Sequence, residues 1–460
     1  MKVTLITARL RFETAGGVTG TEVGSGENGT VLPIRKDPSG QATLPGTTIA
    51  GNLRAHCTAI DAELGALFGD TPEQLDEKHR KAERENTEPE RATPSTIQVL
   101  GTVLHRGGDT ISHTRNTADR SRGAARTHHV HRVEMLTQGT QFDVVLRWDN
   151  ANPDLLRDRF LPALKQWRPM LGRGVTRGAG RCSLIGWGTK DYALDSAEGL
   201  LAWLRDTDLE SRPEPSGTPP DAAEPDHPLD ADLSIVDALH CGTGDAETTP
   251  GGKNNQLKAF RHGTQFVVPG STLKGVLRTR AEYICRVLGL AACQDQRCGN
   301  CRPCRLFGFA GESAALRGRI AVEDAMIQHA KSQRRPHVAI DRFTGGARDQ
   351  ALYEHEVVAQ GTFTLQVRWL LPSSQDATDA EGSNSPASEA VQDTRLLNAA
   401  LEDLNEGYVG IGARTMAGYG SVRVETCRSK RFELTELAGV LRNPVTEPDP
   451  ATVRNQEEEQ

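Results

Sequence analysis

Residues Leu44–Arg54 read LPGTTIAGNLR, and residues Val268–Arg278 read VPGSTLKGVLR. Both stretches fit one pattern: an apolar residue, Pro-Gly, Ser or Thr, Thr, an apolar residue, and then Gly and Leu-Arg at fixed spacing. A motif that recurs at this distance within one chain is typical of a duplicated domain. The repeat therefore predicts two copies of one fold, and each half of the sequence can be compared with the other.

Three further landmarks recur in the same order in both halves. Leu-Phe-Gly occurs at residues 67–69 and 306–308, and Gln-Gly-Thr occurs at 138–140 and 360–362, each followed by an Arg-Trp pair. A glycine run comes last in each half. Chance matching of short glycine-containing strings would not be expected to keep this order, so we interpret the pattern as a duplication.

Length and composition are those of a globular protein with more than one domain. The 460 residues are 37% hydrophobic, which is enough for two or three domains. No apolar run reaches transmembrane length and the N-terminus lacks a signal-peptide pattern, so we expect a cytoplasmic protein with no membrane partner. The formal net charge of −7 argues against unselective binding of nucleic acid. Nine cysteines in such a protein indicate free thiols or metal ligands rather than disulfides.

Composition also predicts the domain boundaries. The first domain is expected at residues 1–205 and the second at 231–443. They are joined by a linker at 206–230 that is rich in Pro, Ser, Asp and Glu. Residues 444–460 are expected to form an acidic disordered tail. A charged segment inside the first domain, Thr71–Arg91, predicts an exposed helix or a flexible insertion.

Both halves predict the same order of elements. Val3–Phe12 and Leu233–Leu239 alternate apolar and polar residues, which is typical of strands. The Pro-Gly motif then begins a helix whose first turn Thr47 or Ser271 could cap. In the first copy, one helical face is predicted to hold Ile49, Leu53, Cys57, Ile60, Leu64 and Leu67. The fold class is therefore α+β with an antiparallel sheet, and later strands are expected at Gln141–Trp148, Ser183–Gly186, Gly361–Trp369 and Ser421–Thr426.

The helix that follows Pro-Gly is the first candidate site. Its first backbone N–H groups and the positive end of its dipole would suit an anion, and Arg54, Lys274 and Arg278 add positive charge. The alternative is a capped structural helix that binds no ligand, and spacing alone does not exclude it.

A basic segment, His105–Arg132, is the second candidate site. It holds six Arg and five His against two Asp, which indicates a mobile basic loop that could bind phosphates. The second copy has the shorter His337–Arg348 in the equivalent place. The alternative is a solvated loop, and the histidines are not expected to bind metal because no Glu or Cys lies among them. The candidate RNA-binding residues here are Arg115, Arg120, Arg122, Arg126, Arg342 and Arg348.

Four cysteines in the second copy are the third candidate site. Cys293, Cys298, Cys301 and Cys304 lie within twelve residues, and four thiolates this close can surround a zinc ion. An iron–sulfur cluster is the alternative, but the Arg, Asn, Gln and Asp between the cysteines favour structural zinc. The first copy has no counterpart, so we expect a zinc-binding insertion between the helix and Leu-Phe-Gly.

The glycine runs are the fourth feature. They read LGRGVTRGAGRCS from Leu171 and VGIGARTMAGYGS from Val409. Glycines at this density permit close approach of the backbone to a ligand, and Arg414 is a candidate contact. The match to dinucleotide-binding loops is weak, because no strand–loop–helix unit follows.

Together these stretches resemble the RAMP superfamily, and most closely the backbone subunits of type III CRISPR–Cas effector complexes. The second copy resembles the family throughout, whereas the first is more divergent between its matching stretches. The matching stretches are Val268–Arg278, Leu306–Gly308, Asp341–Ala347, Glu354–Thr362 and Gly410–Gly420, with Leu44–Arg54, Glu134–Thr140 and Gly172–Gly180 in the first copy. The resemblance implies two modified ferredoxin-like (RRM-like) domains in a tandem fusion, as in type III-D-like systems.

The resemblance also implies a function. Such subunits bind crRNA along a filament, present it to target RNA and work with other type III effector subunits in antiviral defence. A protruding hairpin kinks the guide at regular intervals, and His337–Arg348 and His105–Arg132 are the candidates for guide or target contact. The Pro-Gly-Ser/Thr helix, with Thr47 and Ser271 in its first turn, would hold guide phosphates. Zinc-bearing insertions also occur in such subunits.

Cleavage is where the sequence departs from the family. Cleaving subunits carry an aspartate before the Pro-Gly motif, and it assists attack by the 2′-hydroxyl of target RNA, for which a divalent metal such as Mg²⁺ is a candidate cofactor. The aspartate position falls on Val31 in the first copy and on Asn254 or Asn255 in the second. Neither type can replace a carboxylate in proton transfer. Glu27 and Asp245 are the remaining acid candidates, and we expect at least one copy not to cleave.

Two other functions remain open. One is a stand-alone ribonuclease that processes precursor crRNA, for which the only base candidates are His128, His129 and His131. The other is a zinc-stabilised interaction scaffold with no role in RNA cleavage.

Overall fold

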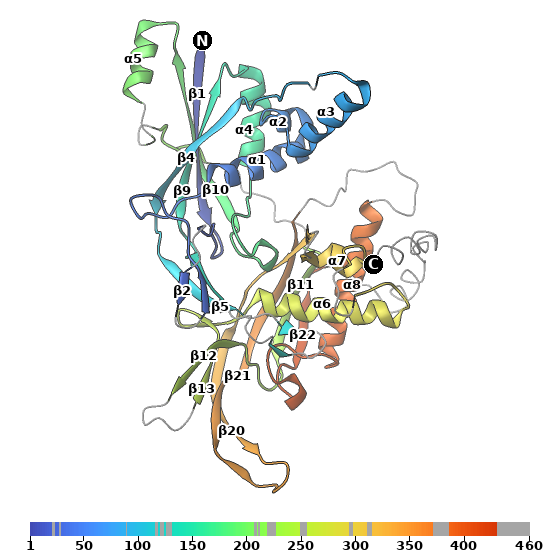
Figure 1. Ribbon diagram of the computed structural model, residues 1–460. Helices are drawn as coiled ribbons and strands as arrows, with labels where there is room; N and C mark the ends of the chain where they lie inside the picture. Colours follow the sequence, from blue (N-terminus) through green and yellow to red (C-terminus); the bar gives the residue numbers. More distant parts are fainter. Residues whose placement is uncertain are drawn as a thin grey trace. The chain divides into compact units, whose positions relative to one another are not determined.

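The computed structural model describes residues 1–20, 24–26, 29–88, 90–115, 118–119, 124–125, 131–206, 209, 212–218, 227–248, 255–293, 298–310, 315–370 and 386–429 (Figure 1). The chain forms two compact units. The first comprises Met1–Arg115 and Val130–Glu224, and the second comprises Pro225–Gln460 and the segment Asn116–His129. None of the helices in these described ranges is long and apolar enough to cross a membrane.

The first unit is built on a four-stranded antiparallel sheet. In sheet order its strands are β10 (Cys182–Ala193), β1 (Lys2–Phe12), β9 (Gln141–Asp149) and β4 (Ile97–Arg106). Alternation along β1 sends Ile6, Leu10 and Phe12 into one core with Ile49 and Leu53 of helix α1. The opposite face of β1 packs Val3 and Leu5 near α5 (Ala197–Arg205).

Helix α1 (Gly46–Ile60) is shorter than the sequence pattern predicts. Ile49, Leu53 and Cys57 are buried as expected, but Ile60 is 50% exposed. Asp61 then leaves the helical conformation, with φ −159° and ψ 119°, and its side chain accepts from the Glu63 amide at 2.9 Å to cap α2 (Ala62–Ala66). The prediction of one helical face that reaches Leu67 was therefore wrong. An Asp whose side chain caps the next helix adopts a non-helical backbone, so α1 ends before it.

The remaining helices of the first unit lie around this core. α3 (Pro72–Glu85) occupies the charged segment Thr71–Arg91 and buries only Ala82. The π-helical turn η1 (Leu155–Phe160) leads into α4 (Leu161–Lys165), and the 3₁₀ turn η2 (Val175–Arg177) lies in the first glycine run. α1 and α4 both contribute side chains to the core on the same face of the sheet (Figure 1).

A second sheet of the first unit contains parts of the predicted basic loop. Its order is β2 (Gly24–Gly26), β3 (Gly29–Leu32), β8 (His131–Leu136) and β5 (Thr110–Arg115). The short strands β6 (Ala118–Asp119) and β7 (Ala124–Ala125) pair with each other. The described parts of His105–Arg132 are thus mostly strands, and not the open loop that composition indicated.

The segment before the second unit is partly packed. Asp143 of β9 is buried, and Arg212 donates to one of its carboxylate oxygens at 2.8 Å while Arg9 donates to the other at 2.7 Å. Gly217 forms a bridge with Trp187 of β10. Residues 212–218 therefore lie along the sheet of the first unit, although their composition is that of a linker.

The second unit repeats the central topology of the first. Around β11 (Leu229–Ile235) the order is β22 (Val422–Cys427), β11, β21 (Ala347–Trp369) and β18 (Ile320–Val322). The helices α6 (Gly270–Val287) and α8 (Pro386–Asn405) follow in the same chain positions as α1 and α4. Leu229, Ala231, Leu233 and Ile235 pack with both helices in one core. Each unit therefore has the chain order strand–helix–strand–strand–helix–strand, with the strands arranged 4-1-3-2 in the sheet.

A long hairpin extends from this sheet. β20 (Gln328–Ile340) pairs with β21 from Thr362 back to Ala347, and the turn between them carries Phe343, which is 99% exposed. Asp341 holds the turn by accepting from the amides of Phe343 and Thr344 at 2.9 Å. Figure 1 shows this hairpin reaching beyond β12 (Gly242–Thr248) and β13 (Asn255–Ala259), which pair beside it.

Short elements complete the second unit. α7 (Arg302–Phe307) precedes the pair β16 (Gly308–Ala310) and β17 (Ala315–Arg317). A three-stranded sheet joins β14 (Arg261–His262), β15 (Gln265–Val268) and β19 (Ala325–Met326). The 3₁₀ turn η4 (Thr415–Ala417) lies in the second glycine run.

Candidate metal centre and nucleic-acid interface

The four cysteines of the second unit converge on one point. Their Sγ atoms all lie within 4.8 Å of one another, and Cys293 is 3.7 Å from Cys301 and 3.6 Å from Cys304. A tetrahedral ion with metal–sulfur bonds of about 2.3 Å would place its ligands about 3.8 Å apart. The donor set and its spacing therefore fit a closed four-cysteine zinc site, in which each thiolate would be a ligand and no position would be left for a substrate.

Local structure explains how the cysteines meet. Cys301 precedes α7 and Cys304 lies within it, while Gly299 has a φ of 75° that lets the chain turn between the ligands. The amide of Cys298 donates to Cys293 Sγ at 3.2 Å, and the amide of Cys301 donates to Cys298 Sγ at 3.3 Å. Burial would raise the pKa of Cys298, but hydrogen bonds from the Cys301 amide and the Cys293 thiol outweigh it and lower the pKa to about 7.

Ion pairs attach this cysteine knuckle to α8. Arg302, which follows Cys301, contacts the buried carboxylate of Asp393 at 3.0 Å. Arg305 contacts Glu389 at 2.9 Å. In the chain, the knuckle lies between the end of α6 and the Leu-Phe-Gly landmark. In space, these ion pairs hold it against α8.

The arginines that end the Pro-Gly motif have internal partners. Arg278 donates to the carbonyl of Gly308, to Glu282 and, at 3.5 Å, to Cys304 Sγ. Arg54 donates to the carbonyl of Gly69 and to Gln74. Both guanidinium groups therefore stabilise their own unit, and their role in RNA binding stays a prediction.

The predicted caps of the two motif helices were wrong. Pro45 and Pro269 occupy the cap positions, with ψ of 136° and 135°, so Thr47 and Ser271 lie inside the first turn and neither position has a side-chain cap. At the start of α6 the Gly270 amide instead donates to Asp324 at 2.6 Å. A carboxylate from the protein itself thus already occupies part of the anion site expected at this helix.

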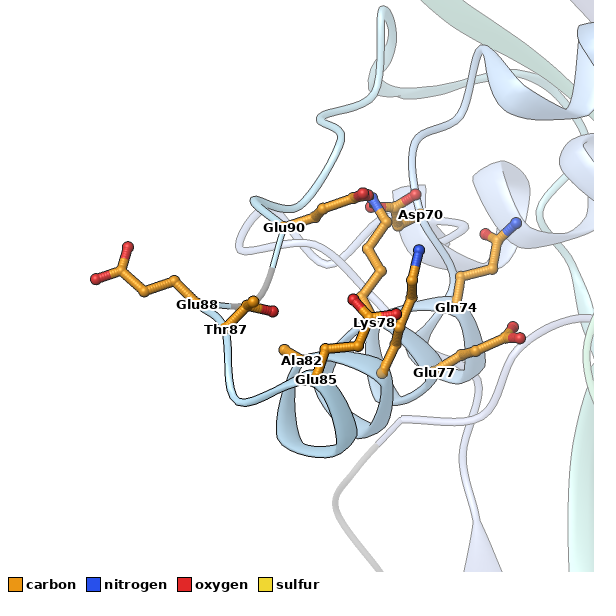
Figure 2. A pocket seen from close by; sticks show the side chains of 10 residues that line it. Asp70, Gln74, Glu77, Lys78, Ala82, Glu85, Thr87, Glu88 and Glu90 are labelled. Atoms are coloured by element: carbon orange, nitrogen blue, oxygen red, sulfur yellow. Dashed lines mark hydrogen bonds and ion pairs between the residues drawn. The ribbon is translucent and has the colours of Figure 1, made fainter.

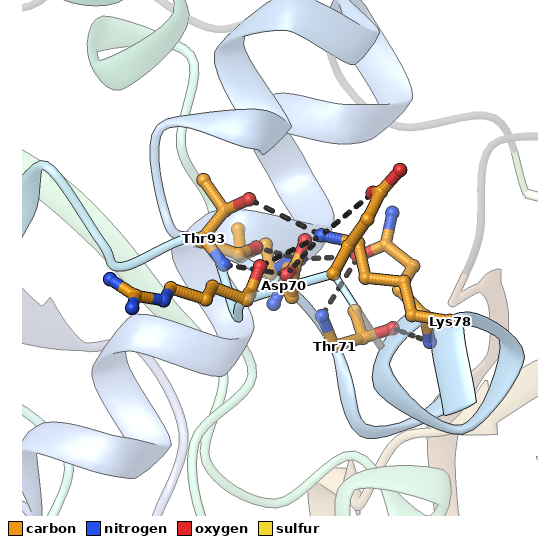
Figure 3. Close-up of polar contacts among 9 residues, drawn as sticks. Asp70, Thr71, Lys78 and Thr93 are labelled. Atoms are coloured by element: carbon orange, nitrogen blue, oxygen red, sulfur yellow. Dashed lines mark hydrogen bonds and ion pairs between the residues drawn. The ribbon is translucent and has the colours of Figure 1, made fainter. Parts of the chain in front are cut away.

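A surface pocket lies beside α3, but its charge does not suit RNA. It has a volume of about 340 Å³, and Figure 2 shows its lining of Asp70, Glu77, Glu85, Glu88 and Glu90 beside Lys78. Asp70 accepts from the Thr93 amide at 2.7 Å and from Lys78 at 2.9 Å (Figure 3). These two contacts lower the pKa of Asp70, so the group stays ionised and ties the loop after α3 to the helix.

The glycine runs approach the chain's own backbone. A Cβ on Gly172 would lie 1.8 Å from the carbonyl oxygen of Gly17, and one on Gly412 would lie 2.5 Å from that of His240. Both residues have positive φ, of 93° and 90°. Glycine is required at these positions for packing, which is a different reason from the ligand approach that the sequence indicated.

The remaining predicted site residues are partly inside and partly outside the described ranges. Glu27, Arg120, Arg122, Arg126 and the bases His128 and His129 fall outside the described residues. The backbone of Arg115 pairs with His131 between β5 and β8, and Asp245 lies in β12. In the hairpin, Arg342 and Arg348 are exposed, while Lys274 on α6 is half-buried.

Sequence reasoning missed a group of rings at the base of the hairpin, which we call the histidine cluster: His240, His337, Tyr353, His355, Arg414 and Tyr419. The His240 and His355 rings stack at 4.8 Å, and the His337 and Tyr353 rings stack at 5.5 Å. His337 Nε2 lies 3.0 Å from the Tyr419 hydroxyl. Strand register places His337 opposite Tyr353, a pairing that the sequence could have revealed only if the hairpin turn were already known.

The cluster keeps its imidazoles neutral. Burial lowers the pKa of His240 and of His337. Burial, together with the neighbouring His240, Arg414 and His337, lowers the pKa of His355 to about 4. At neutral pH the cluster therefore presents uncharged rings beside the positive charge of Arg414.

Comparison with known proteins agrees with the duplication. A family model described as the RAMP superfamily matches this chain twice, at residues 14–183 and at residues 232–423. No curated protein matches the chain.

Proposed function

The chain belongs to the RAMP superfamily, and from this premise we propose that it is a crRNA-binding backbone subunit of a type III CRISPR–Cas effector complex. Members of this superfamily bind crRNA and work in Cas complexes. The observation that carries the proposal is the double match, one in each unit, on two units with the same central topology. A chain with two such units would hold two successive segments of one guide and present them to complementary target RNA.

The topology supports a modified ferredoxin-like fold for each unit. The strand order 4-1-3-2, with both helices on one face, is the order of a split βαβ pair. RRM domains bind RNA on aromatic rings of the open sheet face. In the second unit that face instead carries Asp230 and Asp232, paired with Arg428 at 2.6 Å. RNA is therefore expected at the hairpin and the glycine-rich loop.

Exposed charge and apolar area on the hairpin support this placement. Arg342 and Arg348 flank the exposed ring of Phe343, and Ile340 is also exposed. Arginines suit the phosphates of a guide, and exposed apolar side chains suit unstacked bases. Zinc in the four-cysteine site would have a structural role, by fixing the start of α7 to the chain that follows α6.

Binding can be tested on the full-length chain co-expressed with a CRISPR array. We expect the purified protein to carry crRNA, and a triple charge reversal of Lys274, Arg342 and Arg348 to Glu to reduce the bound RNA strongly. The matched control reverses Arg80, Lys81 and Arg84, which lie on the exposed helix α3. Equal RNA content in both variants and the wild type would refute the proposed surface.

Target cleavage is a separate part of the proposal. Glu27 and Asp245 are its candidate acids, with a divalent ion such as Mg²⁺ as cofactor. In the assembled complex, fragments of target RNA at regular spacing should disappear in Glu27→Ala or in Asp245→Ala, which would identify the active unit. Cleavage of a CRISPR-repeat RNA by the isolated chain would instead favour the alternative role in precursor processing.

A further inference from the structure

Arg414 is a cation without a carboxylate neighbour among the described residues. Its guanidinium donates to the Tyr353 hydroxyl and lies 5.0 Å from the centre of that ring. The other arginines nearby are neutralised, since Arg335 pairs with Asp237 at 2.8 Å and Arg261 pairs with Glu356. A half-buried guanidinium that no carboxylate neutralises favours binding of an anion.

His337 lies next to this charge and can exchange protons with solvent. It is half-buried, whereas His240 and His355 are each 3% exposed. The groups that face it are Tyr353 and His355 of β21, Arg335 of β20, and Tyr419 and Arg414 of the glycine-rich loop. His240, after β11, stacks on His355. Since Asp237 and Glu356 are engaged by arginines, the surroundings of His337 oppose its protonation, and a bound anion would reverse that effect.

His355 carries an unpaired polar atom within the cluster. Its Nδ1 is buried and has no hydrogen-bond partner among the described residues. An unpaired buried polar atom costs about 1–3 kcal/mol. A phenylalanine ring could stack on His240 without this cost, so packing alone does not explain an imidazole at this position.

Building on the RNA-binding role proposed above, we propose that the histidine cluster binds one phosphodiester group of RNA and that His337 takes up a proton when it does so. Arg414 would donate to the phosphate, and its charge would then no longer repel a proton on His337. The protonated imidazole would be a second charged donor to the same phosphate. Because binding takes up a proton, RNA affinity should rise as the pH falls from 8 to 6.

The test measures the dissociation constant of a labelled single-stranded RNA for the full-length chain between pH 8 and pH 6, at fixed salt. We expect wild-type affinity to rise by about threefold to tenfold, where tenfold is the ceiling if the bound phosphate shifts the proton equilibrium of His337 by a factor of ten. His337→Gln cannot gain a proton in this pH range and should lose most of the rise. The matched control His79→Gln changes an exposed histidine of α3 and should keep the full rise.

Arg414→Gln provides a second variant in a loop, should His337→Gln fail to fold. It is expected to shrink the pH effect and to reduce the slope of log affinity against log salt by about one, because one phosphate contact is lost. Equal pH dependence in wild type and His337→Gln, with RNA binding intact, would overturn this inference and leave the proposed function standing. Absence of RNA binding by the wild type at every pH would overturn both.

Discussion

Arg278 donates a hydrogen bond from Nη1 to the carbonyl oxygen of Gly308 at 2.6 Å, and Arg54 makes the matching bond to the carbonyl of Gly69 in the first unit. The two arginines end the repeated Pro-Gly motif, and the two glycines end the repeated Leu-Phe-Gly. One hydrogen bond thus joins two landmarks of each half of the sequence. The repeat preserves a contact, and not only a set of residues.

Removing this bond should destabilise each unit. Arg278→Ala is expected to lower the free energy of unfolding by about 3 kcal/mol, because it also takes a charged partner from the buried Glu282. Arg54→Ala should cost about 1–2 kcal/mol, since its second partner, Gln74, is exposed. Urea unfolding measures both, with the exposed Arg84→Ala as control. Losses equal to that control would contradict a structural role for the two arginines.

Metal removal should affect the second unit selectively. The purified chain is expected to contain about one zinc ion, and a chelator or Cys304→Ser should lower the melting temperature of the second unit. Cys427→Ser, at a cysteine outside the four-cysteine site, is the control and should keep the metal. Elemental analysis with thermal unfolding checks this prediction. Iron with visible absorbance would point to the iron–sulfur alternative.

Asp143 should make the first unit sensitive to acid. Its burial would raise the pKa, but Arg9 and Arg212 outweigh it, and the pKa lies below the usual 3.8. A lowered carboxyl pKa contributes stability that is present above the unfolded-state value and is lost as the pH falls through the folded-state value. Asp143→Asn should therefore cost about 3 kcal/mol in urea unfolding at pH 7. This difference from wild type should narrow below pH 3.8, and a constant difference across that range would count against the ion pairs.

Asp324 should stabilise the start of α6. Asp324→Ala removes the acceptor of the Gly270 amide and is expected to cost about 1 kcal/mol of unfolding free energy. Asp76→Ala, on the exposed face of α3, is the control. If Asp324→Ala tightened RNA binding as well, the carboxylate would be competing with phosphate for this helix N-terminus. An unchanged stability would show that water replaces the cap.

Local patterns predicted the elements better than their ends or their partners. Alternation in Val3–Phe12 found β1 almost to the residue. The helical spacing from Ile49 predicted one helix that continues beyond Asp61, because hydrophobic periodicity does not detect a residue that ends one helix and caps the next. The strand expected at Leu233–Leu239 lies instead at Leu229–Ile235, where alternate residues are buried. The domain boundaries and the RNA-contact residues stay predictions.

By itself, the sequence determined the duplication, the α+β class and the four cysteines that meet, because each depends on spacing within a short stretch. The tertiary structure decided which groups those stretches contact. The sequence shows that Arg278 is charged, but only the tertiary structure shows that it donates to the carbonyl of Gly308. His240 and His355 are far apart in the chain and stack because a bridge between Leu239 and Val358 sets their register. Strand pairing joins segments that are distant in the chain, and no local sequence pattern specifies which segment becomes the neighbour.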